Sequence, residues 1–166
     1  MEYLDIVNDA NEVVGQTSRI DAYANRYSLR IVHVLVENSQ GKILFQQVNK
    51  NKPPYPLHWS TSCGGHVMAG ESYEQAAYRE FKEELGIQLA SPEFISDLVF
   101  IASTGQKKFL RIFRTKHNGS FTPDPHEVER LAFFFPSEIQ VMLSDQQKFA
   151  PELEFILREL ILVNHA

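Results

Sequence analysis

The chain has 166 residues, of which 43% are apolar and 22% charged, with a formal net charge of -5. This length and composition predict one globular domain over residues 1–166 and exclude a largely disordered chain. The acidic balance argues against a nucleic-acid partner, because a phosphate-binding face needs clustered Lys and Arg. Met1–Asp5 lacks the basic start of a secretion signal, and no apolar run is long enough for a membrane span. With one cysteine, Cys63, the sequence predicts a reduced, cytoplasmic protein without intrachain disulfides.

The first part of the chain is predicted to consist mainly of strands. Two short strands, Tyr3–Val7 and Glu12–Ser18, flank a turn of Asn and Asp residues. Arg30–Val36 and Lys42–Gln47 follow, and the glycine-containing turn between them predicts a hairpin. Three prolines exclude helix and central strand from Asn49–Pro56, which is therefore predicted to be a loop.

The strongest helix signal lies at Ser72–Leu85. Ser72 can cap this helix, Gln75 stands three residues later as a capping box requires, and Gly86 suits its end. Beyond it, the pattern predicts strands and helices in mixed order: strands at Ile95–Ala102, Lys108–Thr115 and Leu131–Phe135, and helices starting at Ser137 and spanning Pro151–Val163. Such a mixture favours an α/β or α+β sandwich.

Three carboxylates of the predicted helix share one face. Glu80, Glu83 and Glu84 are three and four residues apart, within an arc of roughly 100° beside the apolar stripe. Like charges at this spacing cost roughly 0.2–0.5 kcal/mol per pair, so a compensating cation is expected. Arg79 can pair with Glu83, but only a hard divalent cation such as Mg²⁺ would balance all three acids. A solvated acidic face is the alternative; the glycines of segment 64–71, which allow close backbone approach, favour the metal.

The spacing of these residues extends over a longer pattern. Gly65 is followed after five residues by Glu71, and after seven more by Arg79-Glu80-Phe81-Lys82-Glu83-Glu84-Leu85-Gly86-Ile87. This segment resembles a complete Nudix box, and the order of predicted elements resembles the Nudix α/β/α sandwich with a mixed sheet. The resemblance implies an enzyme that hydrolyses a pyrophosphate bond in a nucleoside diphosphate linked to another moiety.

The resemblance also implies roles for single residues. The expected ligands of Mg²⁺ or Mn²⁺ are the carbonyl of Gly64 and the carboxylates of Glu80, Glu83 and Glu84. The expected catalytic residues are Arg79, which orients the carboxylates, with Glu80, Glu83 and Glu127. Glu80 or an acid of the late loop, Glu127 or Glu129, is the candidate general base, although these loop acids could equally be exposed charges. The expected substrate contacts are Gly65, His66 and Lys108. His66 could instead touch the metal or be satisfied by backbone, and Lys108 could belong to a solvated strand face with Lys107, Arg111 and Arg114.

The N-terminal half is also similar to the isopentenyl-diphosphate isomerase branch of this family, at Arg30–Val34, Trp59 and Gly65-His66 among others. That branch needs a cysteine directly before the Gly-His pair and two histidines seven residues apart. Here Gly64 stands in the cysteine position, and Tyr23 and Arg30 stand in the histidine positions. The sequence therefore favours a hydrolase, with an isomerase-like enzyme or a nucleotide-binding module as alternatives. The expected partner is a small nucleotide-type substrate, and a homodimer is suggested by family habit alone.

Overall fold

The computed structural model describes residues 1–162. The strands of its main sheet are β3 (Leu29–Glu37), β4 (Ile43–Val48), β5 (Trp59–Ser60), β6 (Cys63–His66), β7 (Glu93–Ile101), β8 (Lys107–Lys116) and β9 (Val128–Phe134). The helices are α1 (Arg19–Ala24), α2 (Tyr73–Leu85), α3 (Pro136–Ser144) and α4 (Pro151–Leu157), and α4 continues as a π-helical segment, Arg158–Leu162. Within residues 1–162, none of these helices is long and apolar enough to cross a membrane.

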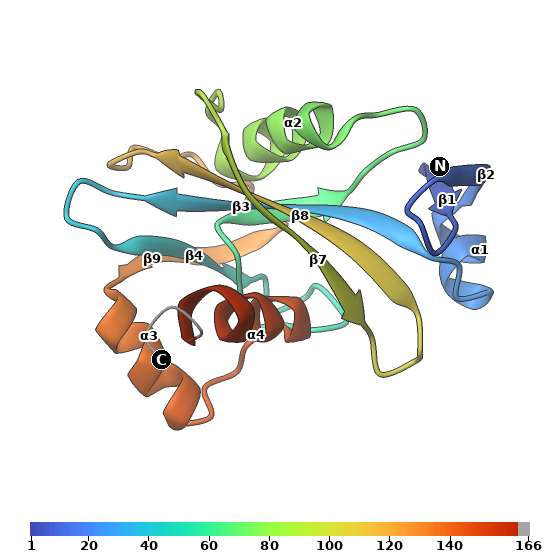
Figure 1. The fold of residues 1–166 in the computed structure, drawn as a ribbon. Coiled ribbons are helices and arrows are strands. Elements are labelled where there is room, and N and C mark those ends of the chain that lie inside the picture. The colour runs from blue at the N-terminus through green and yellow to red at the C-terminus, as the bar shows by residue number, and fades with distance from the viewer. Residues whose placement is uncertain (163–166) are drawn as a thin grey trace.

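The main sheet separates α2 on one face from α3 and α4 on the other (Figure 1). Its strand order is β5-β4-β3-β8-β7, with β6 also paired to β3 and β9 to β4. Strands β3 and β8 run parallel, whereas β3 pairs antiparallel with β4 and with β6. The predicted α/β sandwich with a mixed sheet is therefore confirmed.

Strand β3 has two neighbours along one edge. It pairs with β4 only at Glu37 and Ile43, next to the hairpin turn. Further along, the β6 residues from Cys63 to His66 pair with Val34 back to Ile31. This exchange of partners places the glycines of β6 in the middle of the sheet, directly below α2.

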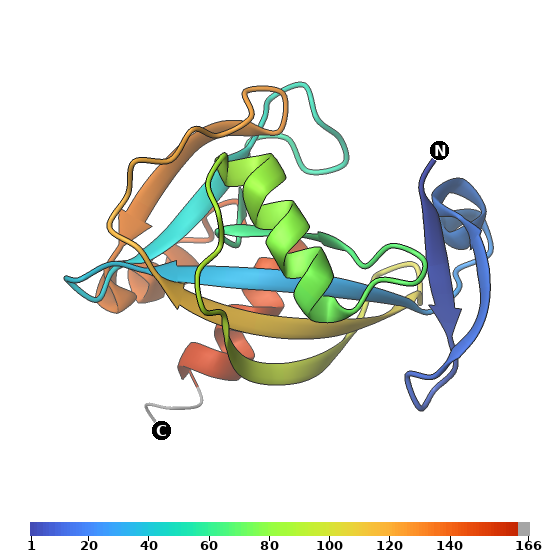
Figure 2. The same ribbon diagram turned by 90° about the horizontal axis from the view of Figure 1, so that it is seen from above.

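A separate two-stranded sheet, β1 (Tyr3–Val7) and β2 (Val13–Ser18), lies with α1 at one end of the main sheet (Figures 1 and 2). Leu4 and Ala22 from this N-terminal unit form a small buried cluster with Leu29, and Met68 packs against them. Leu4 also forms an isolated antiparallel bridge with Met68. The N-terminal unit is thus attached to the segment that leads from β6 into α2.

Helix α2 forms where the sequence predicts it. The Ser72 side chain accepts a hydrogen bond from the Gln75 N–H, and the Gln75 side chain returns one to the Ser72 N–H. Gly86 ends the helix in the left-handed conformation, with φ of 70°, which glycine adopts without steric cost. Phe81 and Leu85 are buried in the cluster that joins α2 to β3, so burial of this apolar face holds the helix on the sheet.

Several short elements differ from the prediction. Helix α1 was not predicted, because six residues are too few to show helical periodicity. Segment 64–71 is not a continuous loop, since Gly64 and Gly65 belong to β6, which is held by backbone pairing despite the low strand propensity of glycine. Strand β9 starts at Val128, earlier than predicted, and Val163, the predicted end of the last helix, lies outside the described residues.

Candidate active site

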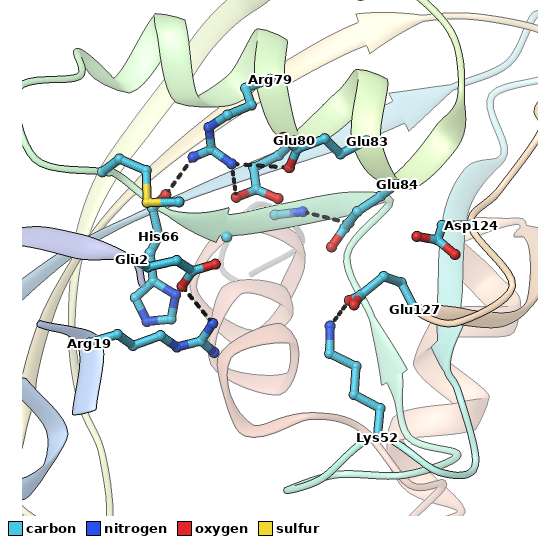
Figure 3. A pocket seen from close by; sticks show the side chains of 13 residues that line it. Glu2, Arg19, Lys52, His66, Arg79, Glu80, Glu83, Glu84, Asp124 and Glu127 are labelled. Atoms are coloured by element: carbon cyan, nitrogen blue, oxygen red, sulfur yellow. Dashed lines mark hydrogen bonds and ion pairs between the residues drawn. The ribbon is translucent and has the colours of Figure 1, made fainter.

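A pocket of about 440 Å³ lies between α2, β6, the N-terminal unit and two loops (Figure 3). It is lined by Glu2, Arg19, Lys52, Gly64, Gly65, His66, Met68, Arg79, Glu80, Glu83, Glu84, Asp124 and Glu127. Apart from Lys108 and the alternative base Glu129, the residues expected to form the site therefore line one pocket.

Arg79 is the centre of the hydrogen-bond network on the α2 wall. Its guanidinium donates to both oxygens of Glu71, at 2.8 and 2.9 Å, and to the His66 carbonyl at 2.9 Å. It also donates to Glu80 at 2.7 Å and to Glu83 at 3.3 Å. The Arg79 hydrogen bonds hold the pKa of Glu71 below its ordinary value. Arg79 thus ties the turn after β6 to α2 and contacts two of the three predicted ligands, Glu80 and Glu83.

Glu84 has a different environment from the other two acids. Its side chain turns toward the sheet, where Oε2 accepts hydrogen bonds from Gln46 Nε2 at 2.8 Å and from the Gly64 N–H at 3.2 Å. Glu84 is 8% exposed, so it lies at the buried edge of the face on which the sequence places the three carboxylates. Burial, followed by the negative charge of Glu80, raises the pKa of Glu84 to about 7. Burial likewise raises the pKa of Glu80, against the opposing effect of Arg79.

The donor set on this wall fits a hard divalent cation. Carboxylate and carbonyl oxygens are the ligands that Mg²⁺ and Mn²⁺ prefer. A cation bound here would offset the burial and the neighbouring negative charges that raise the pKa values of Glu80 and Glu84. No three His, Cys, Asp or Glu side chains of residues 1–162 converge in ligand geometry. The reason is that Glu80 and Glu83 turn to Arg79, whereas Glu84 turns to Gly64.

The two glycines of β6 are required by close packing. A Cβ on Gly65 would collide with the Glu80 carboxylate. A Cβ on Gly64 would stand 2.7 Å from both His33 Nδ1 and the Val32 carbonyl. At Gly65 the backbone of β6 thus lies too close to Glu80 of α2 for a side chain, and at Gly64 it lies too close to Val32 and His33 of β3.

The opposite walls carry residues that sequence reasoning missed. Arg19 pairs with Glu2 at 2.9 Å on the N-terminal unit, and Lys52 pairs with Glu127 on the two loops. In Figure 3 these two cations approach the pocket from the side that faces away from α2. No local pattern could have revealed them, because Glu2, Arg19 and Lys52 are far apart in the sequence and meet only in the fold.

The structure separates two of the predicted substrate contacts. His66 lies in the pocket wall, where Tyr23 Oη is 2.8 Å from its Nε2. Lys108 lies outside the pocket, with Nζ 2.6 Å from Glu152 and 12% of its side chain exposed. The other basic residues of its strand are also paired: Lys107 with Asp9, Arg111 with Asp97 and Arg114 with Glu93. These contacts divide the predicted basic cluster into separate ion pairs.

A sandwich of this kind, with a glycine pair beneath a carboxylate helix, defines a Nudix-type hydrolase site. The NUDIX domain model matches residues 28–154, which is most of the chain. The protein therefore belongs to the Nudix hydrolases, enzymes that cleave pyrophosphate bonds, generally use divalent metal ions and act on small nucleotide-type substrates.

Individual relatives agree with this assignment. The chain is 33% identical over 152 residues to the Nudix hydrolase SCO1686 of Streptomyces coelicolor, covering 91% of this chain and 83% of that protein. It is 31% identical over 138 residues to YfcD of Escherichia coli, covering 83% and 76%. The fold is similar to that of DR0079 from Deinococcus radiodurans, with TM-score 0.82, 25% identity and coverage of 95% and 98%. It is also similar to the NUDIX domain of Shewanella oneidensis NrtR complexed with ADP ribose, with TM-score 0.63, 14% identity and coverage of 86% and 96%.

Proposed function

We propose that the protein is a Mg²⁺- or Mn²⁺-dependent hydrolase that cleaves the pyrophosphate bond of a nucleoside diphosphate linked to another moiety. The observation that carries this proposal is the composition of the pocket. Acids of α2 and the Gly64-Gly65 backbone form one wall, and Arg19 and Lys52 face it from other walls. This arrangement suits a diphosphate, whose oxygens need a metal on one side and cations on the other.

The residues of the chain have distinct roles in this proposal. The Gly64 carbonyl and Glu80, Glu83 and Glu84 would hold the divalent cation, which when bound neutralises phosphate charge and lowers the pKa of a water molecule. Arg79 keeps the carboxylates oriented through its bonds to Glu71, Glu80 and Glu83.

Glu80 is the stronger candidate for the general base. Its carboxylate lies on the α2 wall against Gly65, next to the place proposed for the cation and its bound water, and a carboxylate within reach of that water can accept its proton. Glu127 faces the same pocket but has its carboxylate paired with the Lys52 ammonium. Glu129, the third candidate, accepts a hydrogen bond from the Lys50 N–H in the loop. We therefore assign Glu127 to the pocket wall and proton abstraction to Glu80.

The isomerase alternative depends on Cys63. Its side chain is completely buried in the cluster that joins α2 to the sheet, opposite Val34 of β3. Burial, and then the charges of Glu84 and Glu80, raise the pKa of this thiol well above its ordinary value. A buried, neutral thiol is a poor donor or acceptor of protons at carbon, so the position of Cys63 supports the hydrolase.

A substrate panel with and without metal tests the proposal. Nucleoside diphosphate conjugates and nucleoside triphosphates are incubated with Mg²⁺, with Mn²⁺ and with EDTA, and the released nucleoside monophosphate or phosphate is measured. We expect turnover that disappears in EDTA and returns with either metal. Turnover that persists in EDTA would contradict the metal assignment, and binding without turnover would indicate a nucleotide-binding module.

A parallel incubation with isopentenyl diphosphate covers the second alternative. We expect no dimethylallyl diphosphate, and we expect Cys63→Ala to keep hydrolysis within about threefold, or roughly 0.65 kcal/mol in barrier. Formation of dimethylallyl diphosphate that is lost in Cys63→Ala would identify an isomerase. Cytoplasmic location, a homodimer and the absence of nucleic-acid and membrane partners stay predictions.

A further inference from the structure

A chain of side-chain contacts leads from the pocket wall to helix α4. Tyr23 Oη lies 2.8 Å from His66 Nε2, and the two rings meet edge to face with centroids 5.6 Å apart. The Lys108 ammonium interacts with the Tyr23 hydroxyl, and its Nζ stands 5.5 Å from the Tyr23 ring centroid. Lys108 in turn donates to Glu152 at 2.6 Å. None of these contacts has a role in the mechanism above.

The far end of this chain is firmly anchored. Glu152, in the first turn of α4, accepts from Lys108 through one oxygen and contacts His33 Nε2 at 2.9 Å through the other. His33 Nδ1 is 2.8 Å from Thr61 Oγ1, which donates to the Cys63 carbonyl. The His33 and Lys108 side chains are only 6% and 12% exposed. Tyr23 is therefore held by groups that are fixed on three different elements.

These contacts determine which nitrogen of a neutral His66 ring carries the proton. Lys108 is a pure donor whose positive charge lies beside Tyr23. This charge favours the orientation in which the Tyr23 oxygen lone pairs face Lys108 and the hydroxyl hydrogen points toward His66 Nε2. Nε2 is then an acceptor, and the proton of the neutral ring stands on Nδ1. Nδ1 has no hydrogen-bond partner among residues 1–162, and it is not sealed from solvent. Figure 3 shows the His66 ring at the pocket wall beside Glu2 and Arg19.

We propose that His66 binds an oxygen of the substrate's phosphate groups through Nδ1–H, and that Tyr23 is the positioning residue that fixes this tautomer. Lys108 and Glu152 hold Tyr23 in the required orientation. The identity of the ligand rests on the proposed function, whereas the tautomer rests only on the contacts of this chain. The assignment also excludes His66 as a metal ligand through Nδ1, because a protonated nitrogen has no free lone pair.

Nitrogen-15 NMR of the imidazole tests the tautomer directly. The spectrum is recorded at pH 8, where an ordinary histidine with a pKa of about 6.5 is already neutral. We expect the His66 signals to show a protonated Nδ1 and an accepting Nε2, unchanged by Mg²⁺ alone. Tyr23→Phe should convert them to a mixture of tautomers, and Tyr27→Phe, a nearby exposed tyrosine, should not. A proton on Nε2 in the unmutated protein, or loss of the Nδ1 proton on adding Mg²⁺, would overturn the proposal.

Enzyme kinetics test the proposed hydrogen bond between His66 Nδ1–H and a phosphate oxygen, with a substrate that the panel has identified. Tyr23→Phe should raise KM about fivefold, the size of one ordinary hydrogen bond, with kcat within about twofold, because the contact exists before and during reaction. His66→Asn places an amide nitrogen where Nδ1 stands, whereas His66→Gln places it at Nε2. We expect His66→Asn to raise KM less than His66→Gln does, and Tyr27→Phe to leave it unchanged. Equal increases for both His66 variants would refute the Nδ1 contact.

The two experiments separate this inference from the function on which it rests. If nothing in the panel is hydrolysed, the proposed function fails, and the NMR spectrum still tests the His66 tautomer independently. If hydrolysis occurs while His66 carries its proton on Nε2, the function stands and the inference fails. Should Tyr23→Phe prove unfolded by its melting curve, the spectrum of the unmutated protein decides the tautomer.

Discussion

Glu84 Oε2 accepts a hydrogen bond from the Gly64 N–H, with 3.2 Å between the two atoms. The same oxygen accepts from Gln46 Nε2 at 2.8 Å. One carboxylate thus joins α2 to β6 and β4, and it is also a predicted metal ligand. Its structural contacts need only an acceptor, whereas metal binding needs its charge, so the two can be separated by mutation.

Glu84→Gln removes the charge and keeps an oxygen that can accept both hydrogen bonds. We expect kcat to fall at least about a hundredfold, or roughly 2.7 kcal/mol or more. The free energy of unfolding in EDTA should be equal or slightly higher, because the repulsion from Glu80 disappears. Denaturant titration measures the second effect. Glu74→Gln, an exposed position on the same helix, is the control, and a large loss of stability in Glu84→Gln would show that its charge is structural.

Alanine at the two glycines of β6 should have different effects. In Gly65→Ala the new methyl group displaces the flexible Glu80 carboxylate, so we expect a strong loss of kcat with a modest loss of stability. In Gly64→Ala the methyl group meets the Val32 carbonyl at 2.7 Å, and backbone cannot move aside easily, so we expect mainly destabilisation. Melting temperature and single-turnover rates of both variants check this, and a fully active Gly65→Ala would argue against a role for Glu80.

The general base can be identified by comparing Glu80→Gln with Glu127→Gln. General-base catalysis contributes about 10²–10⁴-fold, so we expect Glu80→Gln to lose at least about a hundredfold in kcat. Glu127→Gln releases Lys52 from its ion pair and should lose less than about tenfold. Glu129→Gln, two residues further along the chain in β9, serves as control. The reverse order of the two losses would assign the base to Glu127.

Stability should depend on pH through Glu152. Burial alone would raise the pKa of this acid, but His33 and Lys108 outweigh it and hold the pKa at about 2, below the ordinary value of 4.5. The ionised form therefore stabilises the fold above pH 4.5, and this contribution, about 3 kcal/mol, is lost as the pH falls toward 2. Glu152→Gln should be less stable than the unmutated protein at pH 7 and approach it in acid. Denaturant titrations between pH 3 and 7 measure this, with Glu154→Gln, a half-buried position on the same helix that pairs with Arg158, as control; a constant difference would refute it.

The parts of the fold that the sequence predicts well are those with local signals. The ends of α2 follow from Ser72, Gln75 and Gly86, and hairpin β3–β4 follows from its turn. Strand β6 has no such signal, because it depends on β3, a distant segment. The only local sign of α1 is its cap, Ser18, which accepts a hydrogen bond from the Asp21 N–H, and a cap without helical periodicity does not predict a helix.

The same distinction applies to the candidate site. The α2 acids and Gly64-Gly65 could be predicted because the Nudix pattern is contiguous. The burial of Glu84 could also have been predicted, because Glu84 lies three residues after Phe81, on the edge of the apolar stripe. The pairing of Lys108 with Glu152 could not have been predicted, because Glu152 lies 44 positions later in the sequence, on α4. Long-range pairing of this kind is decided by the tertiary fold.

The boundary of the family match divides the pocket. The acids of α2, the glycines of β6 and the Lys52 and Glu127 loops fall inside residues 28–154, whereas Glu2, Arg19 and Tyr23 precede them. Contacts that join this N-terminal wall to the segment after β6 include the packing and bridge between Leu4 and Met68. Exchange of the first 27 residues for another sequence would thus change which molecules the pocket admits, while the α2 acids and the β6 glycines that we propose as the metal site stay the same.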